Sequence, residues 1–261
     1  MNLSLKGKNA LVCGSSQGIG FAIAQELSFL GANCILMARN EISLKQAISK
    51  LDQSIDQKHE YLVADFSDNQ QVAKVVNDFV QEKTVHILIN NTGGPPAGPI
   101  VLAKSEDFLQ AYQAHLINNH LLATAVLEGM KSSGYGRIVN IISTSVKVPL
   151  ANLGVSNTTR AAVAGWAKTL ANEVAKFGVT VNNVLPGATS TARLSSIIEN
   201  KSIKTNTGQD EVEKEMLHEI PMGRFGMPEE IAAMAAFLTT PAAAYITGQS
   251  ICVDGGRTGS I

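Results

Sequence analysis

A glycine-rich run near the start of the chain has the residue types and the spacing to hold a phosphate group. It reads Gly14-Ser15-Ser16-Gln17-Gly18-Ile19-Gly20, with an apolar segment before it and an amphipathic segment after it. Gly14 lets the chain turn sharply off a strand, and Gly18 and Gly20 leave room for a pyrophosphate and for close packing of helix on strand. The first turn of the following helix points free N–H groups at the anion. The run predicts a dinucleotide site; the alternative is an ordinary tight turn.

Further polar residues stand at the ends of predicted strands, where open α/β sheets bind ligands. Asp65 can accept a hydrogen bond from an adenine amino group or simply begin a helix, and Asn90 can line the pocket or bond the backbone across its loop. An NAD enzyme usually has an acid at the end of the second strand. This chain has Met37-Ala38-Arg39-Asn40 there, and the guanidinium of Arg39 suits a 2′-phosphate. NADP(H) is therefore expected rather than NAD(H), with the hydroxyls of Ser15 and Ser16 as further donors.

The composition fits one α/β domain over residues 1–261. The chain is 45% hydrophobic and 16% charged with a net charge of −1, so neither nucleic acid nor a membrane surface is an expected partner, and no metal site is expected. The segment Met1 to Lys8 lacks the apolar stretch of a signal peptide, and Thr239-Thr240-Pro241 interrupts the apolar run Ile231 to Ile246. Three cysteines without framework spacing predict buried, reduced thiols in a cytoplasmic protein: Cys13, Cys34 and Cys252.

Short β-branched runs alternate with longer helical patterns, which predicts βαβ units around a parallel sheet. The expected fold is a Rossmann-type doubly wound sheet in three α/β/α layers. The expected strands are Asn9 to Cys13, Cys34 to Ala38, Tyr61 to Ala64, His86 to Asn90, Gly136 to Ile142, Val179 to Leu185 and Ser250 to Val253. The expected helices are Gly18 to Leu30, Ser43 to Ile55, a capping-box helix from Ser67 to Lys83, Ser105 to Ser133, Asn152 to Phe177 and one beginning at Pro228.

The segment from Ala188 to Glu219 is polar and follows Pro186-Gly187. It is expected to be a mobile insertion that covers the substrate as a lid, or a disordered loop while no ligand is bound. The loop Gly93-Gly94-Pro95-Pro96 is expected to form the opposite rim of the site.

Along nearly its whole length the chain resembles the short-chain dehydrogenase/reductase family, and most closely the bacterial β-ketoacyl-acyl-carrier-protein reductase type. The motifs that carry the resemblance are Gly14-x-x-x-Gly18-Ile19-Gly20, Asp65, Asn90-Asn91-Thr92-Gly93, Gly136-Arg137-Ile138-Val139-Asn140, Pro186-Gly187, Ile246-Thr247-Gly248 and Val253-Asp254-Gly255-Gly256. It implies an NADP(H)-dependent oxidoreductase of a carbonyl or alcohol. The cofactor residues it implies, besides those named above, are Phe66, Asn91, Gly93, Arg160, Pro186, Gly187 and Thr191. It also implies a homo-oligomer, a tetramer or a dimer.

The catalytic positions depart from that family. Its members use a Tyr as proton donor, a Lys four residues later, a Ser that orients the carbonyl and an Asn that continues a proton relay. By the same spacing this chain has Ser156 at the Tyr position, Arg160 at the Lys position, Ser143 at the Ser position and His115 at the Asn position. A serine hydroxyl is too short and too weakly acidic to replace the phenol directly. Arg160 can span to the ribose but stays protonated.

Three hypotheses follow from these departures. The first is a reductase with a reassigned proton donor, for which His115 and Lys147 are the titratable candidates near Ser143. A water held by Ser156 and Asn157 would then fill the volume of the phenol. The second is a regulatory or scaffold protein that binds the dinucleotide without chemistry. The third is another reaction, a dehydration or isomerisation, on the same scaffold. His115 can also be a plain helix histidine bonded to backbone, and Lys147 a solvated loop residue.

Overall fold

A seven-stranded parallel sheet forms the centre of the computed structural model, which describes residues 1–260. The strand order is β3-β2-β1-β4-β5-β6-β7, so the chain reverses direction across the sheet between β1 and β4. The strands are β1 (Asn9–Cys13), β2 (Asn33–Ala38), β3 (Glu60–Val63), β4 (Ile87–Asn90), β5 (Gly136–Ile141), β6 (Val179–Pro186) and β7 (Ser250–Val253). The predicted doubly wound fold is confirmed.

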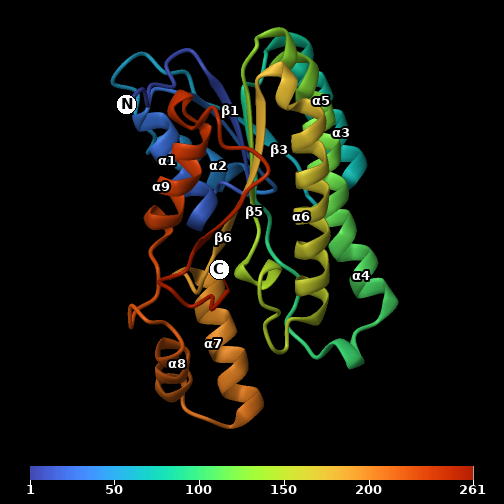
Figure 1. Cartoon of the computed structure of the whole chain (residues 1–261), viewed down its shortest axis with the longest axis vertical. Coiled ribbons are helices and arrows are strands. Elements are labelled where there is room, and N and C mark those ends of the chain that lie inside the picture. The colour runs from blue at the N-terminus through green and yellow to red at the C-terminus, as the bar shows by residue number, and fades with distance from the viewer. Residues whose placement is uncertain (261) are drawn as a thin grey trace.

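Helices cover both faces of this sheet (Figure 1). One face carries α1 (Gly18–Phe29), α2 (Glu41–Ile48) and α9 (Pro228–Thr239); the other carries α3 (Asn69–Glu82), α5 (Asn118–Ser132) and α6 (Gly154–Val174). The helix α4 (Ser105–Tyr112) packs beside α6, on the same side of the sheet. Two further helices, α7 (Ala192–Thr205) and α8 (Gln209–His218), extend beyond the sheet at the lower end of this view.

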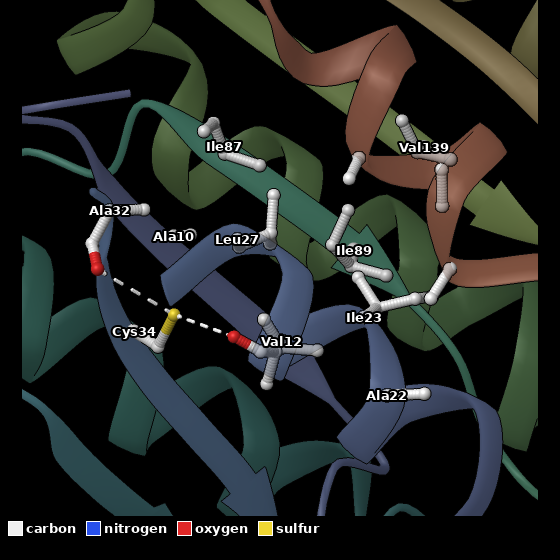
Figure 2. Close-up of a cluster of buried hydrophobic side chains, with 14 of the residues drawn as sticks. Ala10, Val12, Ala22, Ile23, Leu27, Ala32, Cys34, Ile87, Ile89 and Val139 are labelled. Carbon is white, nitrogen blue, oxygen red and sulfur yellow. Dashed lines mark hydrogen bonds between the residues drawn. The ribbon is translucent and has the colours of Figure 1, made fainter. Parts of the chain in front are cut away.

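The core has two layers, one on each face of the sheet. In the layer that α1 covers, aliphatic side chains from three neighbouring strands meet one helix face. Figure 2 shows Val12, Ile89 and Val139 of these strands with Ile23 and Leu27 of α1. Cys34 lies in the same layer, and its thiol donates to the carbonyl oxygen of Ala24 at 3.4 Å. Burial raises the pKa of the thiols of Cys13 and Cys34, which are inert as a result. Cys252, on the edge strand β7, is only half-buried, so the prediction of burial is wrong there.

Two predicted helices differ from the structure. The helix expected to reach Ile55 ends at Ile48, because the hydroxyl of Ser49 bonds the carbonyl of Gln46 and the carboxylate of Asp52 binds Ser54 and Gln57. The continuous helix expected from Ser105 to Ser133 is interrupted by a π-helical turn, η2 (Gln113–Ile117). Turns of this kind often occur at functional sites.

The predicted capping box at Ser67 is also wrong. Asp68 is the N-cap of α3, and its carboxylate accepts from the N–H groups of Gln70 and Gln71. Ser67 instead donates to Asp65.

The segment after β6 is folded, contrary to the prediction of a mobile loop. Thr191 caps α7 by accepting from the N–H of Leu194, and α7 ends at Asn206, whose φ is +53°. A small apolar cluster of Leu194, Ile198 and Val212 joins α7 to α8. The four-residue spacing of Leu194 and Ile198 places both on one side of α7, a pattern that the polar residues around them obscured. We call α7 and α8 together the lid.

Candidate active site

The turn between β1 and α1 is closed by backbone contacts that only glycine permits. Gly14 has φ +58°, and a Cβ there would overlap the carbonyl oxygen of Asn91. A Cβ on Gly20 would overlap the carbonyl oxygen of Gly14. The Nδ2 of Asn91 donates to the carbonyls of Cys13 and Gly14 at 3.3 and 3.1 Å, so this side chain ties the end of β4 to the turn.

The N-terminus of α1 is open to an anion. Its N-cap, Gln17, makes no capping hydrogen bond with its side chain, so the N–H groups of the first turn stay available. A Cβ at Gly18, whose φ is +59°, would lie 3.7 Å from the methyl group of Thr191 at the start of the lid. These residues fit a pyrophosphate, which the helix N-terminus and the bare glycines would hold on one side and Thr191 on the other. Ile19, next in the turn, is half-buried and packs on the core.

The two serines of the turn have different roles. Ser15 is fully buried; its hydroxyl donates to the carbonyl of Val12 at 2.7 Å and accepts from the N–H of Met37. Its one proton is donated to Val12 within the turn, so the predicted donation from Ser15 to a phosphate gains no support from this arrangement. Ser16 is half-buried, and its hydroxyl makes no hydrogen bond with any described residue.

The residues predicted to hold the adenosine end lie at the ends of β2 and β3. Arg39 is exposed just after β2, and its charge helps to hold the pKa of Asp65 below its ordinary value. The main cause of that lowered pKa is the hydrogen bonds that Asp65 accepts from the N–H and hydroxyl of Ser67. Asp65 thus lies close to Arg39 while it fixes the turn that leads into α3.

The other predicted cofactor residues also lie at the carboxyl ends of the strands. Phe66 is half-buried, and its carbonyl accepts from Nδ2 of Asn118 at 2.7 Å. Gly93 is exposed after β4. Pro186 ends β6, and a Cβ on Gly187 would lie 2.8 Å from Asp254, so the chain after β7 packs directly against this turn.

A chain of buried amides crosses the sheet beneath these residues. Asn90 donates to Asn140 at 2.8 Å, Asn140 to Asn183 at 2.9 Å, and Asn183 to the hydroxyl of Ser250 at 3.0 Å. The sequence analysis did not single out Asn140 or Asn183 as partners of Asn90. Asparagine is rare inside strands, and this was the signal that could have found them. The chain fixes the register of β4, β5, β6 and β7 under the site.

The predicted catalytic residues Ser143, Ser156 and Arg160 lie where β5 meets α6. Ser143 follows β5, and its hydroxyl oxygen accepts from the N–H of Ser145 at 3.1 Å. Arg160 is buried, and its Nη1 donates to the carbonyl of Ile141, the last residue of β5, at 3.1 Å. Ser156 is also buried and lies one helical turn before Arg160 on α6.

His115 lies in the π-helical turn and is 2% exposed. Its Nδ1 is 2.6 Å from the hydroxyl oxygen of Thr92, which follows β4. Burial, together with the positive charges of Arg160 and Arg193, lowers the pKa of His115 to about 3. His115 is therefore neutral near pH 7, which argues against it as the reassigned proton donor, since a general acid needs a pKa near the working pH.

Lys147, the other titratable candidate, is exposed on the loop after η3 (Thr144–Val146). Within the described chain its amine makes no hydrogen bond or salt bridge with another site residue. The structure brings Ser143, Ser156, Arg160 and His115 to one region and leaves Lys147 on the surface.

Arg193, in the first turn of α7, was not predicted. It is largely exposed, and its guanidinium donates to the carbonyls of Gly94 and Pro95 at 2.9 and 3.3 Å. The lid thus contacts the loop that was predicted to form the opposite rim. The signal in the sequence was an arginine two residues after Thr191.

Comparisons with known proteins agree with this fold. Residues 14–258 match the family model described as Enoyl-(Acyl carrier protein) reductase. A 3-oxoacyl-[acyl-carrier-protein] reductase of Rickettsia bellii is 34% identical over 97% of this chain and 98% of its own length. The Vibrio cholerae protein of the same description is 37% identical over 97% and 98%.

Solved structures of reductases superpose on this chain along nearly its whole length. YwfH, described as an NADPH-dependent reductase involved in bacilysin biosynthesis, superposes with a TM-score of 0.91 at 31% identity, over 97% of this chain and 99% of that one. The L-sorbose reductase of Gluconobacter frateurii, solved with NADPH and L-sorbose, gives a TM-score of 0.92 at 29% identity over the whole of both chains. With its glycine turn, its strand order and these full-length matches, the chain belongs to the short-chain dehydrogenase/reductase family.

Proposed function

We propose that this chain is an NADP(H)-dependent oxidoreductase that interconverts a carbonyl and an alcohol, with 3-oxoacyl-type compounds as the first substrate class to test. The observation that carries the proposal is the open N-terminus of α1, which lies between bare glycines and Thr191. A helix N-terminus without a side-chain cap, placed beside glycines that leave space for a ligand, is the arrangement that dinucleotide sites use. The reductases among its relatives support the choice of reaction.

The choice of NADP(H) is supported by the charge at the ends of β2 and β3. Arg39 is exposed there and Ser16 has a free hydroxyl, while Asp65, the acid whose pKa Arg39 helps to lower, is engaged with Ser67. A carboxylate that bound the ribose 2′-hydroxyl would repel a 2′-phosphate, whereas a guanidinium attracts it. Two of the structural neighbours are described with bound NADPH or NADP.

In the proposed reaction the cofactor, when bound, supplies or takes up the hydride. Ser143 would orient the substrate carbonyl from the end of β5. Arg160 would bind the ribose and stabilise the negative charge that develops on the carbonyl oxygen, since a buried fixed charge acts strongly there. Burial, and to a lesser extent Arg193, lower the pKa of Arg160 to about 10, so the guanidinium is charged at pH 7.

The proton for the alkoxide would come from a bound water rather than from a side chain, and the hydroxide left behind would take up a proton from bulk solvent. The Oδ1 of Asn157 is buried beside Ser156 in the sequence and accepts no hydrogen bond from the described residues. It can therefore accept one from a water that also bonds the hydroxyl of Ser156. This route replaces the phenol of the family with a bound water.

A second candidate function is dinucleotide binding without turnover, in a regulatory or scaffold role. The observation in its favour is that Ser143, Ser156, Arg160 and His115 provide no side chain with a pKa near neutrality that could donate a proton. Another reaction at the same site, the third hypothesis, gains no support from this arrangement.

We also propose that the protein is a homo-oligomer and works in the cytoplasm. Its three free cysteines suit a reducing compartment. Within residues 1–260, no helix is long and apolar enough to cross a membrane.

The test is a titration of the purified protein with NADPH and NADH, followed by a panel of ketones that includes 3-oxoacyl thioesters. Tight NADPH binding with turnover supports the enzyme, and binding without turnover supports the second function. Arg39→Ala should raise the Kd for NADPH about tenfold through the lost charge-assisted contact and leave that for NADH unchanged. Equal weakening of both cofactors would contradict the assignment of the 2′-phosphate to Arg39. Failure of the wild type to bind either cofactor would remove the proposal.

A further inference from the structure

The mouth of the site carries more positive charge than the proposed cofactor reaction needs. Arg160 and Arg193 come from different elements, α6 and the lid, and both lie against Gly94 in the rim loop. A methyl group on Gly94 would be 2.6 Å from Nη2 of Arg193 and 3.4 Å from Nη2 of Arg160. The two terminal nitrogens therefore flank the same point.

No acid neutralises this pair. Among residues 1–260 the salt bridges lie elsewhere, and both guanidiniums donate only to backbone carbonyls. The neighbouring titratable side chain is His115, and its pKa is lowered first by burial and then by the charges of these two cations. Burial and the charge of Arg193 both lower the pKa of Arg160. Two like charges held close together repel each other, and an anion bound between them would relieve this repulsion.

The cofactor does not account for both charges. Its pyrophosphate has the N-terminus of α1, and its 2′-phosphate has Arg39 at the far side of the glycine turn. The nicotinamide ribose that Arg160 would contact is neutral, and other members of the family bind it with one lysine. Arg193 lies instead where the lid contacts the rim loop.

We propose that Arg160 and Arg193 together bind a carboxylate of the substrate, so that the natural substrate is an anionic oxo or hydroxy acid rather than a neutral ketone. A guanidinium presents a planar fork of donors that matches a carboxylate, and the Nη2 and Nε of Arg160 have no other partner among the described residues. Because Arg193 belongs to the lid, the bound carboxylate would also hold the lid against the rim. This inference rests on the proposed function, whose site it completes.

The test is carboxylate binding to the protein saturated with NADP⁺, where a carbonyl compound can bind without reduction. The probes are 2-oxobutanoate and 2-oxooctanoate, each compared with its neutral methyl ester by calorimetry, with and without NADP⁺. We expect at least one acid to bind about tenfold more tightly than its ester, since one charge-assisted contact is worth this factor or more. Arg193→Gln should remove that preference, and Arg193→Lys should keep part of it.

Arg193 is the variant of choice because Arg160 is also expected to contact the ribose. Lys176→Gln is the matched control, since it removes one exposed positive charge at the far end of α6. Equal binding of acid and ester, or no binding of either acid, overturns the inference. So does an Arg193→Gln protein whose Kd for NADPH rises as much as its Kd for the acid, because the guanidinium would then serve the cofactor phosphates. If the wild type did not bind NADPH, the proposed function would be overturned instead. The comparison of acid and ester without NADP⁺ would still test whether the two arginines bind a carboxylate.

Discussion

At the scale of single residues, the positions that the family's spacing assigns to catalysis are predicted to hold charge and protons differently in this chain. By that spacing Ser156 and Arg160 stand where the family has a tyrosine and a lysine, and His115, which is neutral near pH 7, stands where it has an asparagine. A neutral imidazole can share a hydrogen bond with Thr92, but it lacks the second, acidic proton of the imidazolium form that a proton donor needs at pH 7. The positive charge that remains, on Arg160, can bind the cofactor and polarise a carbonyl group, but it does not release a proton.

Arg160→Ala should weaken NADPH binding about tenfold or more, because the substitution removes a buried donor from the ribose and leaves the carbonyl of Ile141 without its partner. The Kd is measured by quenching of protein fluorescence or by calorimetry. Lys176→Gln, in the exposed 3-10 turn that follows α6, should bind NADPH like the wild type. An unchanged Kd in Arg160→Ala would exclude a role in cofactor binding.

His115 should make the protein sensitive to acid. Its folded pKa of about 3 lies below the ordinary 6.5, so below pH 6.5 the unfolded chain binds a proton that the folded protein does not. Stability is complete above pH 6.5 and falls as the pH drops toward 3. Between pH 7.5 and pH 5 the loss of unfolding free energy should be about 2 kcal/mol, at about 1.4 kcal/mol per pH unit below 6.5.

Urea unfolding of the wild type and of His115→Asn at both pH values measures this contribution. The asparagine lacks the titrating group, so its stability should fall by about 2 kcal/mol less over the same interval. His86, whose pKa burial also lowers, is present in both proteins and cancels from the comparison. Equal losses in the two proteins would mean that His115 titrates normally in the fold.

At the scale of elements, the lid is a separate small unit attached to a rigid sheet. Its own apolar cluster is small, and its contacts with the rest of the site are made by Thr191 and Arg193 at the start of α7. The sheet beneath is fixed by the amide chain through Asn90, Asn140 and Asn183. An element with few buried apolar contacts opens at lower free energy than the core does.

Val212→Asp should unfold the lid without unfolding the domain. Val212 is fully buried in the lid cluster, and an unpaired carboxylate there costs several kcal/mol, more than a cluster of this size supplies. Hydrogen exchange should speed up in residues 192–218 and stay slow in β1, β4 and β5. Lys214→Ala, an exposed neighbour on α8, serves as the control. Uniform acceleration across the sheet would show that the lid is part of the cooperative core.

At the scale of the whole molecule, apolar side chains remain exposed on the α4 side of the fold. They are Ile100, Val101, Leu102, Leu109 and Ile117, each 42% exposed or more. Monomers rarely leave such a series open to water, and contiguous apolar patches commonly form interfaces between copies. The region spans η1 (Ile100–Leu102), α4 and η2, which includes the π-helical turn that carries His115. An interface there would pack against the π-helical turn that carries His115.

Leu109→Glu combined with Ile117→Glu should shift the protein toward the monomer, because the two charges would be desolvated at the interface. Light scattering coupled to size-exclusion chromatography gives the mass. Ile42→Glu, on the exposed side of α2, should keep the wild-type mass. If the wild-type protein had the molar mass of a single chain, the prediction of an oligomer would be wrong, and no variant would be needed.

The sequence by itself determined the sheet, the glycine turn and the family. These features depend on local patterns: alternation of β-branched runs with helical ones, and glycines at positions where a Cβ would overlap the backbone of Asn91 or Gly14. Spacing along the chain also led to the prediction that Ser156, Arg160 and His115 stand at the family's catalytic positions.

Only the tertiary structure decided what those residues can do. The pKa of His115 depends on burial and on two cations that are distant in sequence, and the proton of Ser15 is committed to Val12 by the packing of β1 on β2. The meeting of Arg160 and Arg193 at Gly94 joins three segments that no local pattern connects. Charge and burial are set by neighbours in space, which spacing along the chain does not reveal.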